Sequence, residues 1–403
     1  MTEAQKILLS LVSRAMGTET SEAFPEDEVL RRAVVEESIH QSVCLLVCDS
    51  MYENERTQDT AYRTLKKYAD VTFKNNILGY EHHRFVSECL RENNIPFVII
   101  KGISSDKFYP KKYLRSIGDV DIFVRPEYTE FAQKVLIHVG FNQLSNASEH
   151  HLAYVKERCR VELHYTIGDA PECIKETVDN IFFSENGIVE TAEYVDYGGA
   201  KLPVCNSYFH GLTLLLHTAG HISSEGIGLR HLCDWAAFIK DYNSESFCNE
   251  FEKVCKKLGL WTLAQVLTKA AGYIGVPKFE FSESRADNTA ETLMEDIFFV
   301  GNMGQKNING VFSKLNRHDT DKGVEKSKIR YLFNTLNNHV YTHIPAAKCH
   351  KLLLLPGYVY VIFRRAWLRL TGQRKRVHIG KSYENAKQRD RFIESLKLYS
   401  RQK

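Results

Sequence analysis

The chain has 403 residues, of which 53 are Lys or Arg and 50 are Asp or Glu, so its formal net charge is only +3. This length allows two or three domains with sizeable cores. The near balance of charge argues against the concentrated basic face of duplex-binding proteins, and we expect no sequence-specific nucleic-acid partner. The 10 cysteines contain no CxxC pair, and the N-terminus has no signal-peptide pattern. We therefore expect a cytoplasmic protein with reduced thiols.

Hydrophobic periodicity predicts helices towards both ends of the chain and strands between them. Short runs rich in Val, Ile and Phe, bounded by Gly, Pro and polar residues, predict strands over 97–100, 120–124, 151–156 and 159–165. Most other segments have helical spacing. We therefore expect an N-terminal helical region (1–92), a strand-containing core (93–204) and a C-terminal helical region (205–403).

Two aspartates lie two residues apart at the second predicted strand, in the sequence Asp119-Val120-Asp121. Alternate residues of a strand share a face, so both carboxylates should point to the same side. Their mutual repulsion calls for a positive charge between them. A divalent metal is the simplest candidate, and Mg²⁺ suits oxygen ligands best, with Mn²⁺ as a substitute. Glu162 adds a carboxylate from a later strand, and three carboxylates can hold two Mg²⁺ ions for nucleotidyl transfer.

Basic residues and a glycine lie close to these acids. Lys101 and Arg115 flank them and could balance phosphate charge, the arginine through paired hydrogen bonds. Gly102 follows Lys101 directly and permits a close approach between backbone and ligand. Glycosyltransferases and haloacid-dehalogenase-like phosphatases also use an Asp-x-Asp motif. Here the apolar strand continues through residues 122–124, which argues against the phosphatase form.

A set of short motifs runs through the middle of the chain, and the set is more specific than any one of its members. The motifs are Lys101-Gly102, Tyr109-Pro110, Arg115, Gly118-Asp119-Val120-Asp121-Ile122 and Val161-Glu162-Leu163-His164, followed by His217, His221, Gly228, Arg230 and Asp234. With this set, the chain resembles the uncharacterised nucleotidyltransferase family of the polymerase-β-like superfamily. The resemblance covers most of residues 5–240.

The resemblance implies an α+β fold with a small mixed β-sheet. It also implies an enzyme that moves a nucleoside monophosphate from an NTP, such as ATP, to a hydroxyl or phosphate of an acceptor, with Mg²⁺ as cofactor. The acceptor would be a small molecule, a glycan or a peptide. The implied metal ligands and catalytic residues are Asp119, Asp121 and Glu162, with Glu162 as base. The implied nucleotide-binding residues are Lys101, Gly102, Arg115 and Gly118.

Further polar residues recur at helical spacing after the core. His217 and His221 are four residues apart, which allows zinc binding. The HExxH motif is absent, however. The favoured interpretation is that these histidines belong to the core or support the residues of the site. Arg230 and Asp234 allow an ion pair within one helix. The resemblance also allows these four residues, together with His164, to line an acceptor cleft. We expect His164 to form hydrogen bonds beside the site rather than to catalyse.

An apolar and basic segment lies near the C-terminus, over residues 351–376. Its longest uncharged run, 352–363, is too short to span a bilayer. An apolar run followed by several Arg and Lys residues can lie on an anionic membrane surface. A helix packed on the protein with a basic rim is the alternative, and this interpretation is favoured.

Two other classes of function stand beside the enzyme. One is a non-catalytic nucleotide- or partner-binding module, which would bind an NTP without Mg²⁺. The other is an accessory protein of a polysaccharide or peptide pathway that contacts a membrane through residues 352–376. The three carboxylates favour the enzyme over both.

Overall fold

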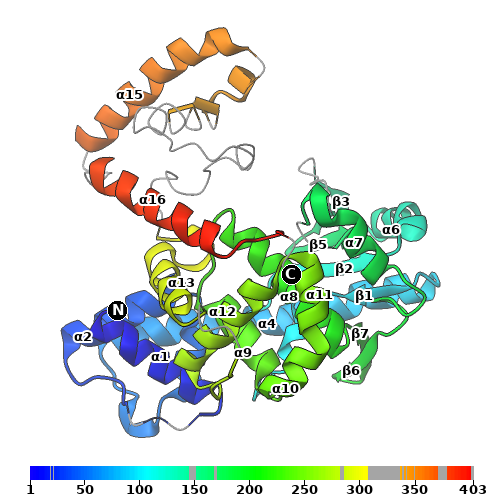
Figure 1. Cartoon of the computed structure of the whole chain (residues 1–403), viewed down its shortest axis with the longest axis horizontal. Helices are drawn as coiled ribbons and strands as arrows, with labels where there is room; N and C mark the ends of the chain where they lie inside the picture. Colours follow the sequence, from blue (N-terminus) through cyan, green and yellow to red (C-terminus); the bar gives the residue numbers. More distant parts are fainter. Residues whose placement is uncertain are drawn as a thin grey trace.

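The computed structural model describes most of the chain (Figure 1). The described residues are 1–18, 20, 22–144, 151–167, 170–281, 286–306, 336–337, 340–341, 343–348, 350–370 and 379–400. Residues 371–376, which belong to the predicted basic and apolar segment, lie outside them.

A seven-stranded mixed sheet forms the centre of the described structure, in the order β3-β4-β5-β2-β1-β7-β6. Its strands are β1 (Phe97–Ile99), β2 (Val120–Val124), β3 (Asn142–Gln143), β4 (His151–Lys156), β5 (Cys159–His164), β6 (Glu193–Tyr197) and β7 (Ala200–Val204). The pairs β2–β5 and β1–β7 are parallel, and the other neighbours are antiparallel. With helices on both sides in the sequence, this confirms the predicted α+β fold and its mixed sheet.

The two faces of the sheet pack against different helices. Ile99, Ile122 and Leu163 belong to a core that includes residues of α4 (Thr60–Glu92) and α6 (Pro126–His138). On the other face, Val98 and Phe123 join a larger core with the C-terminal helices. Because residues alternate along a strand, Asp121 shares the second face with Phe123. The alternation therefore points Asp121 towards the C-terminal helices.

The N-terminal region is helical, as predicted. Its helices are α1 (Glu3–Ala15), α2 (Glu28–His40), α3 (Cys44–Ser50) and the long α4. Thr2, Asp27 and Asp59 cap α1, α2 and α4, because each side-chain oxygen accepts a hydrogen bond from a backbone N–H of the first turn. These caps explain where the helices begin.

The other helices follow in chain order through the core and the C-terminal region. They are α5 (Ile103–Asp106), α6, α7 (Glu172–Phe182), α8 (Ser207–Ile222), α9 (Leu229–Ile239), α10 (Ser244–Phe247), α11 (Lys253–Leu258), α12 (Trp261–Ala271), α13 (Ala286–Val300), α15 (Leu354–Leu370) and α16 (Ile379–Ser395). The sequence patterns did not predict α7, β6 or β7. Strand β6 is largely exposed and therefore has no buried apolar alternation.

Helix α15 extends away from the sheet and from most other helices (Figure 1). Val361 is buried against Val340 and Ala347, but Leu355 and Phe363 are 72% and 73% exposed. One side of α15 therefore packs on the protein, as the favoured interpretation predicts, whereas the other side is exposed. Among the helices in the described ranges, none has the length and apolar character required to cross a membrane.

A buried ion pair joins α1 to η1 (Glu53–Glu55), the short turn that precedes α4. Nη1 of Arg14 lies 3.0 Å from Oε2 of Glu55, and both side chains are buried. Glu55 also accepts hydrogen bonds from the backbone N–H groups of Phe24 and Tyr52, at 2.9 and 2.7 Å. One carboxylate thus holds three segments together.

Replacement of Glu55 by Ala should lower the free energy of unfolding by about 3 kcal/mol, because it leaves a buried guanidinium without its counter-charge. Urea unfolding followed by circular dichroism measures the loss. Glu53→Ala is the matched control, since Glu53 is exposed in the same turn, and it should change stability by less than about 0.5 kcal/mol. Equal effects of the two substitutions would contradict the role given to Glu55.

Candidate active site

A cavity of about 690 Å³ lies between the sheet and the helices α4, α8 and α9. All the residues that the sequence analysis singled out for the site line this cavity. They are Lys101, Gly102, Arg115, Gly118, Asp119, Asp121, Glu162, His164, His217, His221, Arg230 and Asp234. The fold therefore brings together residues that are up to 133 positions apart in the chain, from Lys101 to Asp234.

Asp121 forms the centre of the polar wall of the sheet. The parallel register of β2 and β5 places it opposite Glu162. Its Oδ1 accepts hydrogen bonds from Nζ of Lys101 at 2.9 Å and Nε2 of His164 at 3.0 Å. Burial by itself raises the pKa of Asp121, but the Lys101 charge and the His164 hydrogen bond hold that pKa well below its ordinary value. Asp121 is therefore ionised at neutral pH.

Arg160 connects the other two carboxylates of the predicted set. Its Nε lies 3.3 Å from Oδ2 of Asp119, and its Nη2 donates to Oε1 of Glu162 at 2.9 Å. Burial of the Asp119 carboxyl group raises its pKa to about 6, and the nearby charges of Asp121 and Glu162 add to this effect. Burial acts to raise the pKa of Glu162, but the neighbouring His164, whose Nε2 lies 3.6 Å from Oε2, keeps that pKa below its ordinary value. The three acids form an acidic patch, and the charges of Lys101 and Arg160 partly offset it.

Histidines extend this patch into a potential metal-binding group. Ligand atoms of His151, Glu162 and His164 lie within 4.8 Å of one another, and Asp121 adjoins them through His164. The position of His151 follows from the β4–β5 pairing, which places it opposite His164. Carboxylate oxygens next to imidazole nitrogens form a donor set that fits a divalent cation. Lys101 adds a positive charge beside these donors through its contact with Oδ1 of Asp121.

Arg115 and Asp234 form a buried, two-armed ion pair in the wall of the cavity. Nε and Nη2 of Arg115 each lie 2.9 Å from one oxygen of Asp234, and both side chains are less than 10% exposed. The Tyr109 hydroxyl donates to Oδ1 of the same carboxylate at 2.8 Å. The ion pair that the sequence allowed within one helix is therefore replaced by a pair between α9 and the loop before β2.

Arg230 is left with weaker contacts than Arg115. Its Nη1 lies 3.5 Å from the backbone carbonyl of Ser116, and its Nε is buried without a hydrogen-bond partner. Within the described ranges, no carboxylate lies within ion-pair distance of Arg230. A partly buried guanidinium of this kind retains N–H groups that can bind an anion in the cavity.

Gly102 turns the chain between β1 and α5. Its φ of +60° favours glycine, and a Cβ atom there would lie 3.2 Å from Nε2 of His83. His83 is a buried residue of α4 whose Nδ1 lies 2.7 Å from the Gly79 carbonyl oxygen. Burial lowers the pKa of His83 to about 4, so this imidazole is neutral. The close approach that the glycine permits is thus to a protein side chain.

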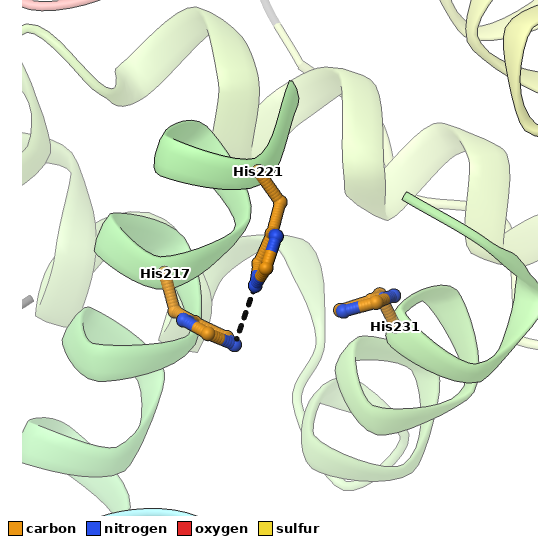
Figure 2. Close-up of side chains that lie close together, drawn as sticks. All are labelled: His217, His221 and His231. Carbon is orange, nitrogen blue, oxygen red and sulfur yellow. Dashed lines mark hydrogen bonds between the residues drawn. The ribbon is translucent and has the colours of Figure 1, made fainter. Parts of the chain in front are cut away.

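The C-terminal helices contribute a cluster of three histidines (Figure 2). His217 and His221 lie one turn apart on α8, and their Nε2 atoms are 3.1 Å apart. His231 of α9 joins them, and ligand atoms of the three residues lie within 4.8 Å of one another. The sequence motifs did not identify His231 as part of this group, nor did they assign roles to His83, His151 or Arg160. Only Arg160 had a local signal, because it lies two residues before Glu162 and so shares its face of β5.

Comparison with known protein families assigns the chain to a family. Residues 27–273 match the model of a family described as uncharacterised nucleotidyltransferase. The chain belongs to this uncharacterised nucleotidyltransferase family. The matched span is more than half of the 403 residues and includes the whole sheet, α8 and α9. A comparison with curated proteins gives no match. Membership supports a general nucleotidyltransferase function and confirms the family that the sequence motifs indicated.

The Arg115–Asp234 pair should be important for stability as well as for the shape of the cavity. Asp234→Asn removes the negative charge but keeps the size of the side chain, so the buried guanidinium of Arg115 loses its counter-charge. We expect the free energy of unfolding to fall by about 3 kcal/mol, measured by urea unfolding. Asp241→Asn, at an exposed position after the same helix, should have an effect below about 0.5 kcal/mol. A loss as small as this for Asp234→Asn would contradict the assignment.

Proposed function

We propose that this protein transfers a nucleoside monophosphate from an NTP to a hydroxyl or phosphate group of an acceptor and releases pyrophosphate. The observation that carries this proposal is the register of β2 and β5, which places Asp121 beside Glu162 in the wall of the cavity. Family membership supports the general reaction type.

Asp119, Asp121 and Glu162 are the proposed ligands of the divalent cation, for which Mg²⁺ is the first candidate and Mn²⁺ the second. The oxygen donors fit these hard cations, and the lowered pKa values of Asp121 and Glu162 keep both groups ionised. When bound, the metal neutralises triphosphate oxygens and favours ionisation of an attacking hydroxyl group.

The proposed reaction forms one bond and breaks one bond at the α-phosphorus of the NTP. The acceptor oxygen forms the new bond, and the bond to the oxygen that bridges the α- and β-phosphates breaks. Pyrophosphate leaves with the electron pair of that bond. Where the acceptor is a hydroxyl, its proton passes to Glu162, which releases it to solvent because its pKa is low. Most of the catalytic effect then comes from positioning and charge stabilisation.

Cationic groups around the acids provide the proposed phosphate contacts. Lys101 contacts Asp121 and can turn to a phosphate once a metal takes over the carboxylate. Gly118 has open space where a Cβ would lie, and so leaves room for a ligand beside Asp119. Arg115 is held by Asp234, so we propose that it mainly shapes the nucleotide site. Arg230 has free N–H capacity and is the better candidate for a direct anion contact.

The acceptor would lie against the helical wall of the cavity. His217, His221, Arg230 and Asp234 occupy this wall, and His164 lines the same cavity from β5, where it contacts Asp121. The mixture of imidazole and guanidinium groups suits a polar or anionic acceptor, which fits a small molecule, a glycan or a peptide.

Transfer is tested with purified protein, Mg²⁺, NTPs labelled on the α-phosphate, and cell extract as a source of acceptor. We expect label to enter an acceptor, and Asp121→Asn to lower the rate at least about 100-fold because it removes a metal ligand. Asp241→Asn is the control with the same chemical change at an exposed position, and its rate should equal that of the wild type. Unchanged labelling by Asp121→Asn, or NTP binding that needs neither Mg²⁺ nor Asp119, would favour the non-catalytic binding module instead.

The exposed face of α15 favours a second role at a membrane surface. Four apolar residues of α15 follow helical spacing and are all more than half exposed, namely Leu355, Val359, Ile362 and Phe363, and Leu352 in the turn before the helix is exposed as well. The sequence has no acidic residue between residues 351 and 383, whereas it has several Arg and Lys. An apolar stripe in a basic segment suits an anionic lipid surface.

Flotation with liposomes tests this role in the full chain. We expect binding to vesicles that contain phosphatidylserine, with at least about tenfold weaker binding after Leu355→Ser and Phe363→Ser together, because two large apolar contacts are lost. Phe131→Ser on α6 is the control, since Phe131 is also an exposed aromatic residue. If the double variant floats as well as the wild type, α15 does not bind the membrane.

A further inference from the structure

In the three-histidine cluster of α8 and α9, a hydrogen bond joins His217 to His221, but Nε2 of His231 is buried without a partner. We propose that His217, His221 and His231 bind a transition-metal ion such as Zn²⁺, at a site separate from the carboxylates. This inference goes beyond the proposed transfer reaction, which needs only the carboxylate site.

The spacing of the two α8 histidines suits one shared metal ion. Residues four apart lie on the same face of a helix, and the Nε2 atoms of His217 and His221 are 3.1 Å apart. With zinc–nitrogen bonds of 2.0–2.1 Å and tetrahedral angles, two ligand nitrogens are about 3.3 Å apart. The observed separation is therefore close to that of two ligands on one ion.

His231 supplies the third nitrogen from the neighbouring helix. Its ring centroid lies 5.2 Å from that of His221, and Figure 2 shows it pointing towards the α8 pair. Its Nε2 is buried and has no hydrogen-bond partner. A buried polar atom without a partner is costly and needs an explanation. Coordination of a metal ion would satisfy it.

The protonation states also suit a metal. Burial lowers the pKa of His217 and of His231 well below the ordinary value, with further lowering from Lys101 and Arg230 respectively. Both rings are therefore neutral, which is the form that binds metals. Nδ1 of His231 accepts a long hydrogen bond, 3.3 Å, from the Gly228 N–H, so its proton lies on Nε2. Nε2 could hold a metal only in the other tautomer, with the proton on Nδ1, and the Gly228 N–H would then give up this long hydrogen bond.

The surroundings select the kind of ion. The charge of Arg230 lies next to the cluster and disfavours any cation that has no strong affinity for nitrogen. Among the common divalent ions, Zn²⁺ and Cu²⁺ bind imidazole strongly, whereas Mg²⁺ and Ca²⁺ prefer oxygen. His217 and His221 are only partly buried and face the cavity. Three protein ligands and an open position are the arrangement of catalytic rather than structural zinc sites.

The experiment uses the full chain, freed of metal with a chelator and then titrated with Zn²⁺ or Co²⁺ alone. Competition with a coloured chelator gives the affinity, and the visible spectrum of Co²⁺ reports tetrahedral coordination. We expect about one tightly bound ion per chain at the histidine cluster, with any binding at the carboxylates being weaker. His221→Asn and His231→Asn should each weaken binding at least about 100-fold, because each removes one ligand.

Two controls separate this site from other histidines and from the carboxylates. His138→Asn changes an exposed histidine of α6 and should leave affinity unchanged. Asp121→Asn should also leave Zn²⁺ affinity unchanged, although it should abolish transfer. The two proposals therefore fail independently: loss of transfer without loss of zinc affinity concerns only the carboxylates.

The proposal is overturned if the wild type binds neither ion, if the His221 and His231 variants bind as tightly as the wild type, or if Asp121→Asn abolishes binding. Circular dichroism checks that each variant is folded. X-ray absorption of the wild-type zinc complex gives a measurement that needs no variant. Three imidazole ligands are expected, and a shell made only of oxygen would overturn the proposal.

Discussion

The pairing of β2 with β5 is the contact on which the cavity depends. It places Asp121 opposite Glu162 and Phe123 opposite His164, so two like charges face the same space. Such a pair is unfavourable unless positive charge or hydrogen bonds offset the repulsion. At Asp121, Lys101 supplies a positive charge and His164 a hydrogen bond. At Glu162 and Asp119, Arg160 supplies the positive charge. The same arrangement that offsets repulsion in the protein leaves acids that can exchange these partners for a metal.

The two arginines of the cavity, Arg115 and Arg230, have different roles. Two nitrogen atoms of Arg115 contact the carboxylate of Asp234. This ion pair connects the loop before β2 to α9. The helical wall is thereby fixed relative to the sheet. Arg230 belongs to the same helix as Asp234 but keeps capacity for an anion. A partly buried cation without a counter-ion costs free energy of folding, and such groups are often found at ligand sites.

The N-terminal helices help to hold the walls of the cavity in place. His83 of α4 packs against Gly102, the residue that turns the chain from β1 towards the cavity. Farther away, Gln41 at the end of α2 accepts a hydrogen bond from the backbone N–H of Leu229, the first residue of α9. The helices before the sheet therefore help to position the helical wall that follows it. The acids on the sheet and the histidines on the helices share one cavity because both walls rest on the same N-terminal region.

The sequence by itself predicted strands β1, β2, β4 and β5, the long helices and the residues of the proposed carboxylate set. Alternation along 120–124 and 159–165, together with the family motifs, was sufficient to place Asp121 and Glu162 on inward-facing positions. Local spacing also indicates α7, since Ile174, Val178 and Phe182 recur every four residues and are buried.

Only the tertiary structure decided which charges pair and which histidines meet. Asp234 lies four residues from Arg230 but binds Arg115, which is 119 residues away. His231 joins His221 across two helices, and His151 meets His164 across two strands. Such contacts depend on how separate elements pack, and spacing within one element carries no information about that packing.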